Sequence, residues 1–381
     1  MTRVLINPRM MRWAFERGGF TLESLDKSFP KLRQWESGEI KPTLNQIEHF
    51  AKTVHVPIGF LFLDEPPTES VPIPDFRTSW NKHKTHPSPD LLDTIFICQQ
   101  RQEWFNEYSR TMGDEPLHFV GSVTRAQDIS EVANNIRDVI GFSIEKRRAL
   151  PTWTDALRTF IEQSDAAGIL VMCSGVVLNN NRRPLNTEEF RGFAITDSLA
   201  PLIFINGADT KAAQMFTIAH ELAHIWLGQS AISDVQPQIQ TDHEIELWCN
   251  SVAAELLVPM ASLQSVYDQN NDILFEINRL ARYFKVSTLV ILRRIFDYKK
   301  LTQEEFWDLY DQELERLRTI PRRAGGNFYL TQSARVSKRF ARALVISTLE
   351  GQTLHRDAFR MLGFTKISTF HELGRSLGIM I

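Results

Sequence analysis

The residues best suited to chemistry are two histidines and a glutamate within His220-Glu221-Leu222-Ala223-His224. Apolar residues around them recur with helical spacing, and side chains four positions apart project from the same face of a helix. His220 and His224 could therefore bind one metal ion, while Glu221 lies beside them without being a ligand. A zinc ion there would lower the pKa of a water molecule to about 7, so that Glu221 could act as the general base.

A catalytic zinc site uses three protein ligands and keeps one position open. The predicted third ligand is Glu246, in a second helical segment, and Asn250 lies one helical turn further along. From there Asn250 could hydrogen-bond a ligand histidine and fix its tautomer. Glu244 is an alternative third ligand, whereas Glu255 is interpreted as a carboxylate on the helix surface. In the competing interpretation, the two histidines have a structural role on a buried helix.

Short apolar runs that end in turn residues precede the histidines and predict buried strands. They lie at residues 168–173, 190–196 and 201–206. Helical periodicity then predicts helices over residues 210–228 and 242–258. A strand therefore leads through a short loop into the histidine helix, and an edge strand there could bind an extended polypeptide by strand addition.

The predicted fold class is α+β and mostly helical, with a small sheet in the part that carries the histidines. Proline-rich stretches and changes of periodicity divide the chain into four segments. These are a small all-helical domain at residues 1–64, a proline-rich linker with a helical connector at 65–148, a metallopeptidase core at 149–262, and a helical C-terminal extension at 263–381.

The composition excludes several classes of protein. At 381 residues and 43% hydrophobic residues, the chain is long enough for two or three folded domains. A formal net charge of −3 gives no long-range field that would attract nucleic acid or a membrane. The three cysteines form no CxxC pair, and no apolar run is long enough for a signal peptide or a membrane span. These properties favour a cytoplasmic protein with no membrane partner.

A longer pattern around the histidines resembles the ImmA/IrrE family of zinc metallopeptidases. It comprises Phe216–His224, Glu246, Asn250 and Ala253–Pro259. The resemblance implies a gluzincin-like core in which His220, His224 and Glu246 bind Zn²⁺ and Glu221 is the general base. Members of that family are linked to cleavage of helix-turn-helix repressors, which releases stress or mobile-element genes.

The N-terminal segment is similar to the XRE helix-turn-helix family, with matches at Trp35–Gly38 and Pro42-Thr43. The segment Pro72–Thr78 then follows, as in longer ImmA/IrrE members fused to such a regulator domain. The sequence departs from the XRE pattern by several missing residues where the recognition helix would begin, which is the helix that reads bases. The candidate DNA contacts that remain are three polar side chains: Lys31, Arg33 and Gln34.

These observations favour a regulatory zinc endopeptidase whose substrate is a specific protein, such as a helix-turn-helix repressor. The alternative is a DNA-binding transcription regulator or antitoxin-like protein with a structural or sensory zinc site. A zinc hydrolase of small molecules is a third hypothesis. Paired N-terminal domains would make the protein a homodimer, and DNA is a partner only if the shortened segment still reads bases.

Overall fold

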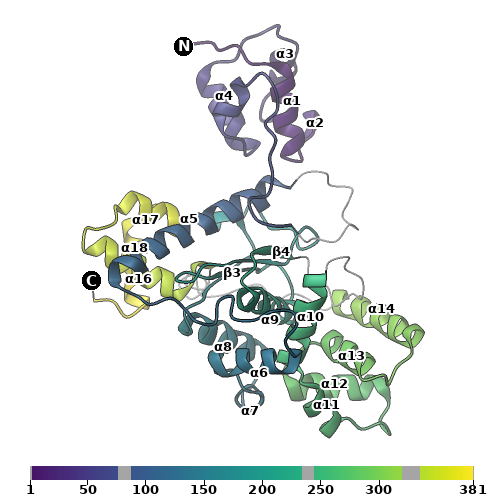
Figure 1. Ribbon diagram of the computed structural model, residues 1–381. Helices are drawn as coiled ribbons and strands as arrows, with labels where there is room; N and C mark the ends of the chain where they lie inside the picture. Colours follow the sequence, from purple (N-terminus) through teal and green to yellow (C-terminus); the bar gives the residue numbers. More distant parts are fainter. Residues whose placement is uncertain (1, 76–86, 234–243, 320–334, 381) are drawn as a thin grey trace. The chain divides into compact units, whose positions relative to one another are not determined.

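The computed structural model describes residues 2–75, 87–233, 244–319 and 335–380 (Figure 1). The predicted class, mostly helical α+β with a small sheet, is confirmed. No helix in these ranges is both long and apolar enough to span a lipid bilayer. The chain divides into two compact units, one formed by Met1–Pro72 with Lys82–Ile95 and the other by Ile73–Asn81 with Phe96–Ile381.

The first unit contains short helices around a small core of its own. They are α1 (Pro8–Arg17), α2 (Leu22–Leu25), α3 (Leu32–Glu36), α4 (Leu44–Thr53) and the 3-10 helix η1 (Ile58–Phe62). The Thr43 side chain accepts a hydrogen bond from the Gln46 amide and caps α4. Leu32, Trp35 and Phe50 are buried among the helices, so this unit has its own hydrophobic interior.

The second unit is built around a four-stranded sheet in the order β1-β3-β2-β4. Its strands are β1 (Leu170–Ser174), β2 (Gly192–Ile195), β3 (Leu202–Asn206) and β4 (Ala231–Ser233). β1 pairs with β3 in parallel, and the other two pairs are antiparallel. The first three strands lie at the predicted apolar runs, whereas β4 was not predicted. β3 is an inner strand, so the two edges of the sheet are β1 and β4.

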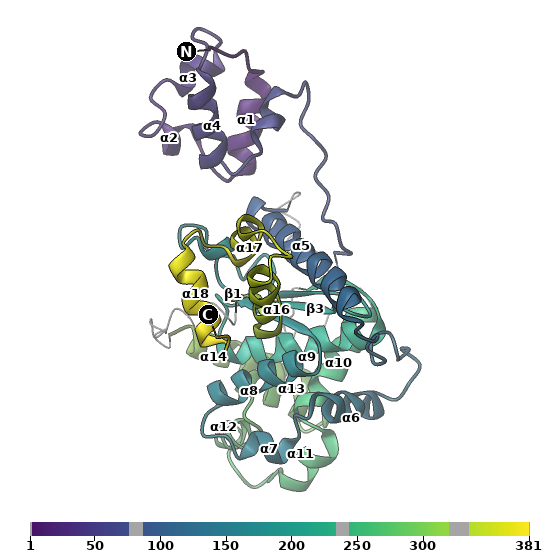
Figure 2. The ribbon, with the colours of Figure 1, turned by 90° about the vertical axis from the view of Figure 1, so that its left-hand side faces the viewer.

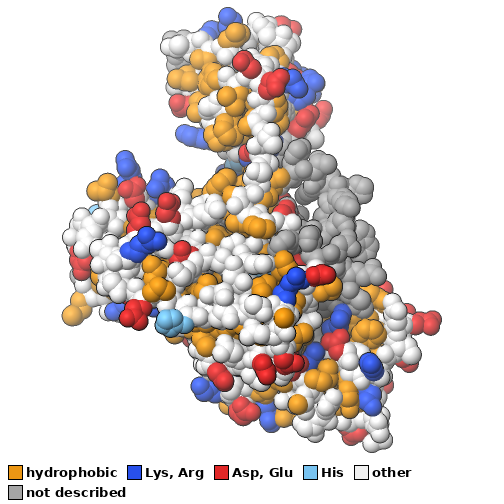
Figure 3. All heavy atoms as spheres, in the orientation of Figure 1, with side chains coloured by type: hydrophobic (Ala, Val, Ile, Leu, Met, Phe, Trp, Pro, Cys, Tyr) orange, Lys and Arg blue, Asp and Glu red, His pale blue; other side chains and the backbone are white. Residues whose placement is uncertain are grey.

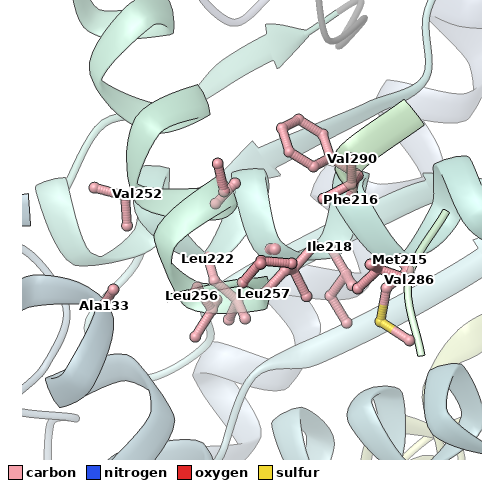
Figure 4. Packing of buried hydrophobic residues seen from close by; sticks show 14 of the residues in the cluster. Ala133, Met215, Phe216, Ile218, Leu222, Val252, Leu256, Leu257, Val286 and Val290 are labelled. Atoms are coloured by element: carbon pink, nitrogen blue, oxygen red, sulfur yellow. The ribbon is translucent and has the colours of Figure 1, made fainter. Parts of the chain in front are cut away.

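Helix α9 (Lys211–Leu227) covers one face of the sheet, and α10 (Glu244–Leu257) packs along α9. α8 (Trp153–Ala166) lies beside α9 against β1, and α6 (Ile129–Ile140) packs on α10. Figure 4 shows the apolar side chains that fill this space, including Ile218 and Leu222 of α9 and Leu257 of α10. The two helices that carry the predicted ligands are therefore held in the centre of the hydrophobic core.

Three buried arginines hold the C-terminal end of α10. Arg137, Arg147 and Arg294 donate hydrogen bonds to the carbonyl groups of residues 255–258. The last carbonyls of a helix have no partner within the helix, so these side chains satisfy groups that would otherwise be buried without one. The position of α10, and with it that of Glu246, is fixed by these contacts.

Helices also cover the other face of the sheet, and further helices follow α10 in the chain. The remaining helical elements are α5 (Pro89–Met112), α7 (Ile144–Arg148), η3 (Val177–Asn179), α11 (Met260–Val266), α12 (Ile273–Phe284), α13 (Thr288–Asp297), α14 (Gln303–Thr319), α16 (Lys338–Leu349), α17 (His355–Leu362) and α18 (Ile367–Ser376). Gln102 of α5 donates to the carbonyls of Ile195 and Ala200, which joins this helix to the face opposite α9 (Figure 2).

The helices α16–α18 are joined to residues far earlier in the chain. Arg101 of α5 donates to the Met361 carbonyl at 2.9 Å, across a separation of 260 positions. At the end of α8, the Asp165 carboxylate accepts hydrogen bonds from the Ser337 hydroxyl and, at 2.8 Å, from the Arg339 amide. The C-terminal helices are thus an integral part of the second unit.

Candidate metal centre

The two predicted histidine ligands lie in the buried middle of α9. Thr210 caps the start of this helix by accepting a hydrogen bond from the Ala213 amide at 3.2 Å. His220 and His224 are fully buried, and their Nε2 atoms are 3.1 Å apart. The spacing of four residues on an uninterrupted helix thus brings both imidazoles to one point.

Helix α10 brings Glu246 to the same point. One carboxylate oxygen of Glu246 lies 3.1 Å from His220 Nε2, and the other lies 3.1 Å from His224 Nε2. The ligand atoms of these three residues lie within 4.8 Å of one another. In the part of the chain that the structure describes, no other group of three or more His, Cys, Asp or Glu side chains converges in this way.

Asn250 orients one of the histidines. Its Oδ1 atom lies 3.0 Å from Nδ1 of His220. An amide oxygen can only accept a hydrogen bond, so Nδ1 of His220 is the donor, and in the neutral imidazole its Nε2 atom would carry the lone pair that a metal ion needs. Asn250 and His220 are thus in hydrogen-bond contact, and the role of Asn250 in orienting a metal ligand stays a prediction.

Glu221 is buried beside the three ligand residues. Among the described residues, no hydrogen-bond donor reaches either of its carboxylate oxygens in favourable geometry. Burial raises its pKa well above the ordinary value, the negative charge of Glu246 raises the pKa further, and the nearby Ser233 side chain partly opposes this. The carboxylate of Glu221 therefore has an increased affinity for a proton.

The electrostatics of the ligand residues fit a divalent metal ion. Burial alone would raise the pKa of Glu246, but the two histidines outweigh it and lower the pKa to about 2. Burial lowers the pKa of His224, which favours the neutral imidazole, although its contact with Glu246 opposes this. Two imidazole nitrogens and one carboxylate, all from buried side chains, form a ligand set typical of catalytic zinc.

The other acidic residues of α10 lie away from the cluster. The Glu244 side chain is 83% exposed and forms an ion pair with Arg125 at 2.6 Å. The expectation that Glu255 lies on the helix surface is wrong: it is buried and forms an ion pair with Arg294. Apolar neighbours in the sequence could not reveal this pair, because Arg294 follows 39 positions later on α13.

Two residues next to Glu221 were missed by the sequence analysis. Gly192 of β2 packs so closely that a Cβ atom there would lie 3.1 Å from Glu221 Oε1 and 2.5 Å from Thr217 Cγ2. Ser233 of β4 pairs with Gly192 and is fully buried. Neither residue belongs to a sequence motif for metal binding or catalysis. The only sequence feature that could have indicated a close contact here is a glycine, Gly192, inside an apolar run.

The candidate DNA contacts lie in the first unit, on or next to α3. Lys31 precedes this helix, and Arg33 and Gln34 lie in it; all three side chains are exposed. Arg33 is 3.3 Å from Asp26 and 3.8 Å from Glu23. The helix has five residues, and its single cation, Arg33, is already paired with carboxylates.

Comparison with known families agrees with the class of site that the geometry defines. Residues 166–296 match the model of a peptidase family, M78, described as the IrrE N-terminal-like domain. This segment contains Glu221 and all three residues of the convergent cluster, and the match supports a metallopeptidase-type function. The ImmA/IrrE resemblance seen in the sequence is thus confirmed for this part of the chain, while the XRE resemblance of the N-terminal segment stays a prediction.

A second match covers part of the C-terminal helices. Residues 336–376, which include α16–α18, match a domain of unknown function, DUF8813. No curated protein and no solved structure matches the chain. The substrate and partners therefore have to be inferred from the residues themselves.

Proposed function

We propose that this protein is a zinc-dependent endopeptidase of the regulatory kind. The observation that carries the proposal is the convergence of His220, His224 and Glu246, with the Glu221 carboxylate buried beside them. The peptidase family match over the same segment supports the reaction class. A role for the histidines in packing alone would not require the ligand atoms of three residues to converge within 4.8 Å of one another.

Each residue has a separate role in this proposal. His220, His224 and Glu246 would hold the zinc ion, and Asn250 would keep His220 in the tautomer that can bind it. The bound ion would supply Lewis acidity, which acidifies water and polarises the carbonyl of a peptide bond. Glu221 would take a proton from the attacking water and pass it to the leaving amine.

The proposed substrate is a specific cytoplasmic protein, for which a helix-turn-helix repressor is the leading candidate. The ImmA/IrrE resemblance suggests this class, because cleavage of such repressors releases stress genes in that family. The first unit supports it, since a compact helical unit fused to a peptidase core is suited to recognising a protein partner. A homodimer formed through these units is part of the same proposal.

A second candidate function is that of a DNA-binding regulator with a structural or sensory zinc site. The exposed side chains of Lys31 and Gln34 on a separate helical unit favour it. Residues 1–72, however, carry nine basic and nine acidic side chains, so they provide no net positive field for phosphates. On the face shown in Figure 3, acidic and basic side chains of the described residues are interspersed. We therefore rank this function second. Its test is whether the purified protein binds the DNA of its own promoter at low salt, and failure to bind would count against it.

The first test is zinc content, measured by mass spectrometry on the purified protein. We expect about one zinc ion per chain, lost in His220→Ala and in Glu246→Ala. Glu244→Ala is the matched control, because this exposed carboxylate lies two residues from Glu246 and should not affect zinc. Absence of zinc from the wild type after reconstitution would refute the metal centre.

The second test is cleavage of candidate helix-turn-helix repressors from the same cell. We expect the wild type to cut one of them at a defined bond and Glu221→Gln, loaded with zinc, to lose this activity by at least about 100-fold. Equal cleavage by the two proteins would show that Glu221 is not the general base. Zinc binding with no cleavage by either protein would favour the regulator instead.

A further inference from the structure

A short segment of the chain occupies the outer edge of β4. Ile73–Asp75, which we call the strap, meets β4 at a parallel bridge between Asp75 and Ile232. The Ile232 amide donates a hydrogen bond to the Pro74 carbonyl at 2.9 Å. The Ile73 side chain is 7% exposed, whereas Pro74 and Asp75 are exposed. A backbone hydrogen bond and an apolar anchor therefore hold the strap in place.

The strand that carries the strap also borders the proposed general base. Ser233 of β4 pairs with Gly192 of β2, and Gly192 packs directly against Glu221. Ser233 is itself fully buried next to the Glu221 carboxylate. A polypeptide on the outer edge of β4 would thus pass close to the proposed catalytic residue.

An edge strand offers unpaired amide and carbonyl groups to any extended chain. β4 is the last strand of the sheet, and Ile232 is the residue whose amide points outward. A substrate that adds to this edge would need the Ile232 amide, which the strap already uses. The strap and such a substrate therefore exclude each other.

The sequence of the strap is suited to a segment that binds to the β4 edge and can be released from it. Pro72 and Pro74 flank Ile73 and restrict the backbone torsions of this segment, which reduces the entropy lost on docking. Proline is compatible with an outermost strand, because its missing amide is not needed there. The strap lies directly after Met1–Pro72 in the chain, so a partner of the first unit could influence it.

We propose that the strap is an internal competitor that covers the β4 edge and keeps extended polypeptides from the site until it is displaced. Its consequence for cleavage rests on the proposed peptidase function, but the competition for β4 does not. If the strap covers β4 for 90–99% of the time, it weakens polypeptide binding about 10- to 100-fold.

The proposal is tested with full-length, zinc-loaded Glu221→Gln protein, so that cleavage does not interfere. Ile73→Asp places a charge at the buried anchor and should release the strap. Ser70→Asp is the matched control, because it adds the same charge at an exposed position three residues upstream. The two readouts are hydrogen exchange of the Ile232 amide and the affinity for fluorescein-labelled, unfolded casein.

We expect Ile73→Asp to speed exchange at Ile232 and to tighten casein binding about 10-fold or more, with Ser70→Asp unchanged. Unchanged exchange at Ile232 would show that the strap does not protect β4. Faster exchange without tighter binding would show that the strap only covers the sheet edge. Hydrogen exchange of the β3 amides is the control for unfolding of the sheet. If Ile73→Asp also speeds that exchange, the test is repeated with Ile73→Ala, which removes the apolar anchor without adding a charge. Neither readout requires peptidase activity, so failure here is distinct from failure of the proposed function.

Discussion

At the scale of single residues, the cluster combines residues whose type and spacing indicate metal binding with residues whose type does not. His220, His224 and Glu246 could be inferred because two helical spacings bring them together and few other residues bind zinc. Asn250 followed from the same periodicity. Gly192 could not be inferred, because its importance comes from the distance between β2 and α9, which no local pattern encodes.

Asn250 gives the first prediction at this scale. Asn250→Ala removes the acceptor for His220 Nδ1, so His220 is free to rotate or to change tautomer. We expect zinc affinity to fall about 10- to 100-fold, measured by competition with a chelator. Asn278→Ala on α12 is the control, because the Asn278 side chain donates to the Leu274 carbonyl of its own helix. Equal affinities for the two variants would contradict the orienting role.

Gly192 gives the second prediction. In Gly192→Ala the new Cβ atom would lie 2.5 Å from Thr217 Cγ2 and 2.9 Å from the Phe204 carbonyl oxygen, so β2 and α9 must move apart. We expect the free energy of unfolding, measured with urea, to fall by about 1–3 kcal/mol. Peptidase activity should fall by a larger factor than zinc content, because Glu221 lies against this position. Gly59→Ala is the control, since its Cβ would meet no atom within 4 Å.

At the scale of secondary structure, the long elements were predictable and the short ones were not. α9 and α10 carry enough helical repeats to be recognised, and β1–β3 are apolar runs with clear ends. β4 has three residues, too few for any alternation to be detected. Its existence depends on pairing with β2 and with the strap, which are tertiary contacts.

The end of α10 gives the prediction at this scale. Arg294→Met leaves the Glu255 carboxylate buried without its cation, so we expect a loss of about 3–5 kcal/mol in the free energy of unfolding. In the double variant Glu255→Gln/Arg294→Met the unpaired charge is gone, and about 1–3 kcal/mol should be regained relative to Arg294→Met. Strictly additive losses in denaturant unfolding would show that the two side chains do not interact.

At the scale of the whole molecule, the C-terminal helices depend on a buried carboxylate. Burial raises the pKa of Asp165, although its hydrogen bonds with Ser337 and Arg339 oppose the increase. As pH rises from about 4, the unfolded chain loses this proton before the folded chain does. Asp165 therefore contributes most to stability at low pH, and its contribution decreases until the pH exceeds the raised pKa.

Asp165→Asn keeps an acceptor for the Arg339 amide but cannot ionise. The stability of this variant relative to the wild type should therefore rise with pH, by about 1.4 kcal/mol for each pH unit between the unfolded and folded pKa values. Urea unfolding between pH 3 and pH 8 measures this difference. A difference that is constant over the whole range would show that the Asp165 pKa is the same in both states.

The contact between Arg101 and Met361 has a consequence for the timing of synthesis. The ribosome completes α10, and with it all the metal ligands, roughly 100 residues before it reaches α17; at about 5–20 residues per second this takes about 5–20 s. During this interval the Arg101 side chain lacks its acceptor, the Met361 carbonyl. The residues of the proposed metal centre are thus synthesised before the helix that supplies the acceptor for Arg101, and during this interval the incomplete second unit is exposed to chaperones and proteases.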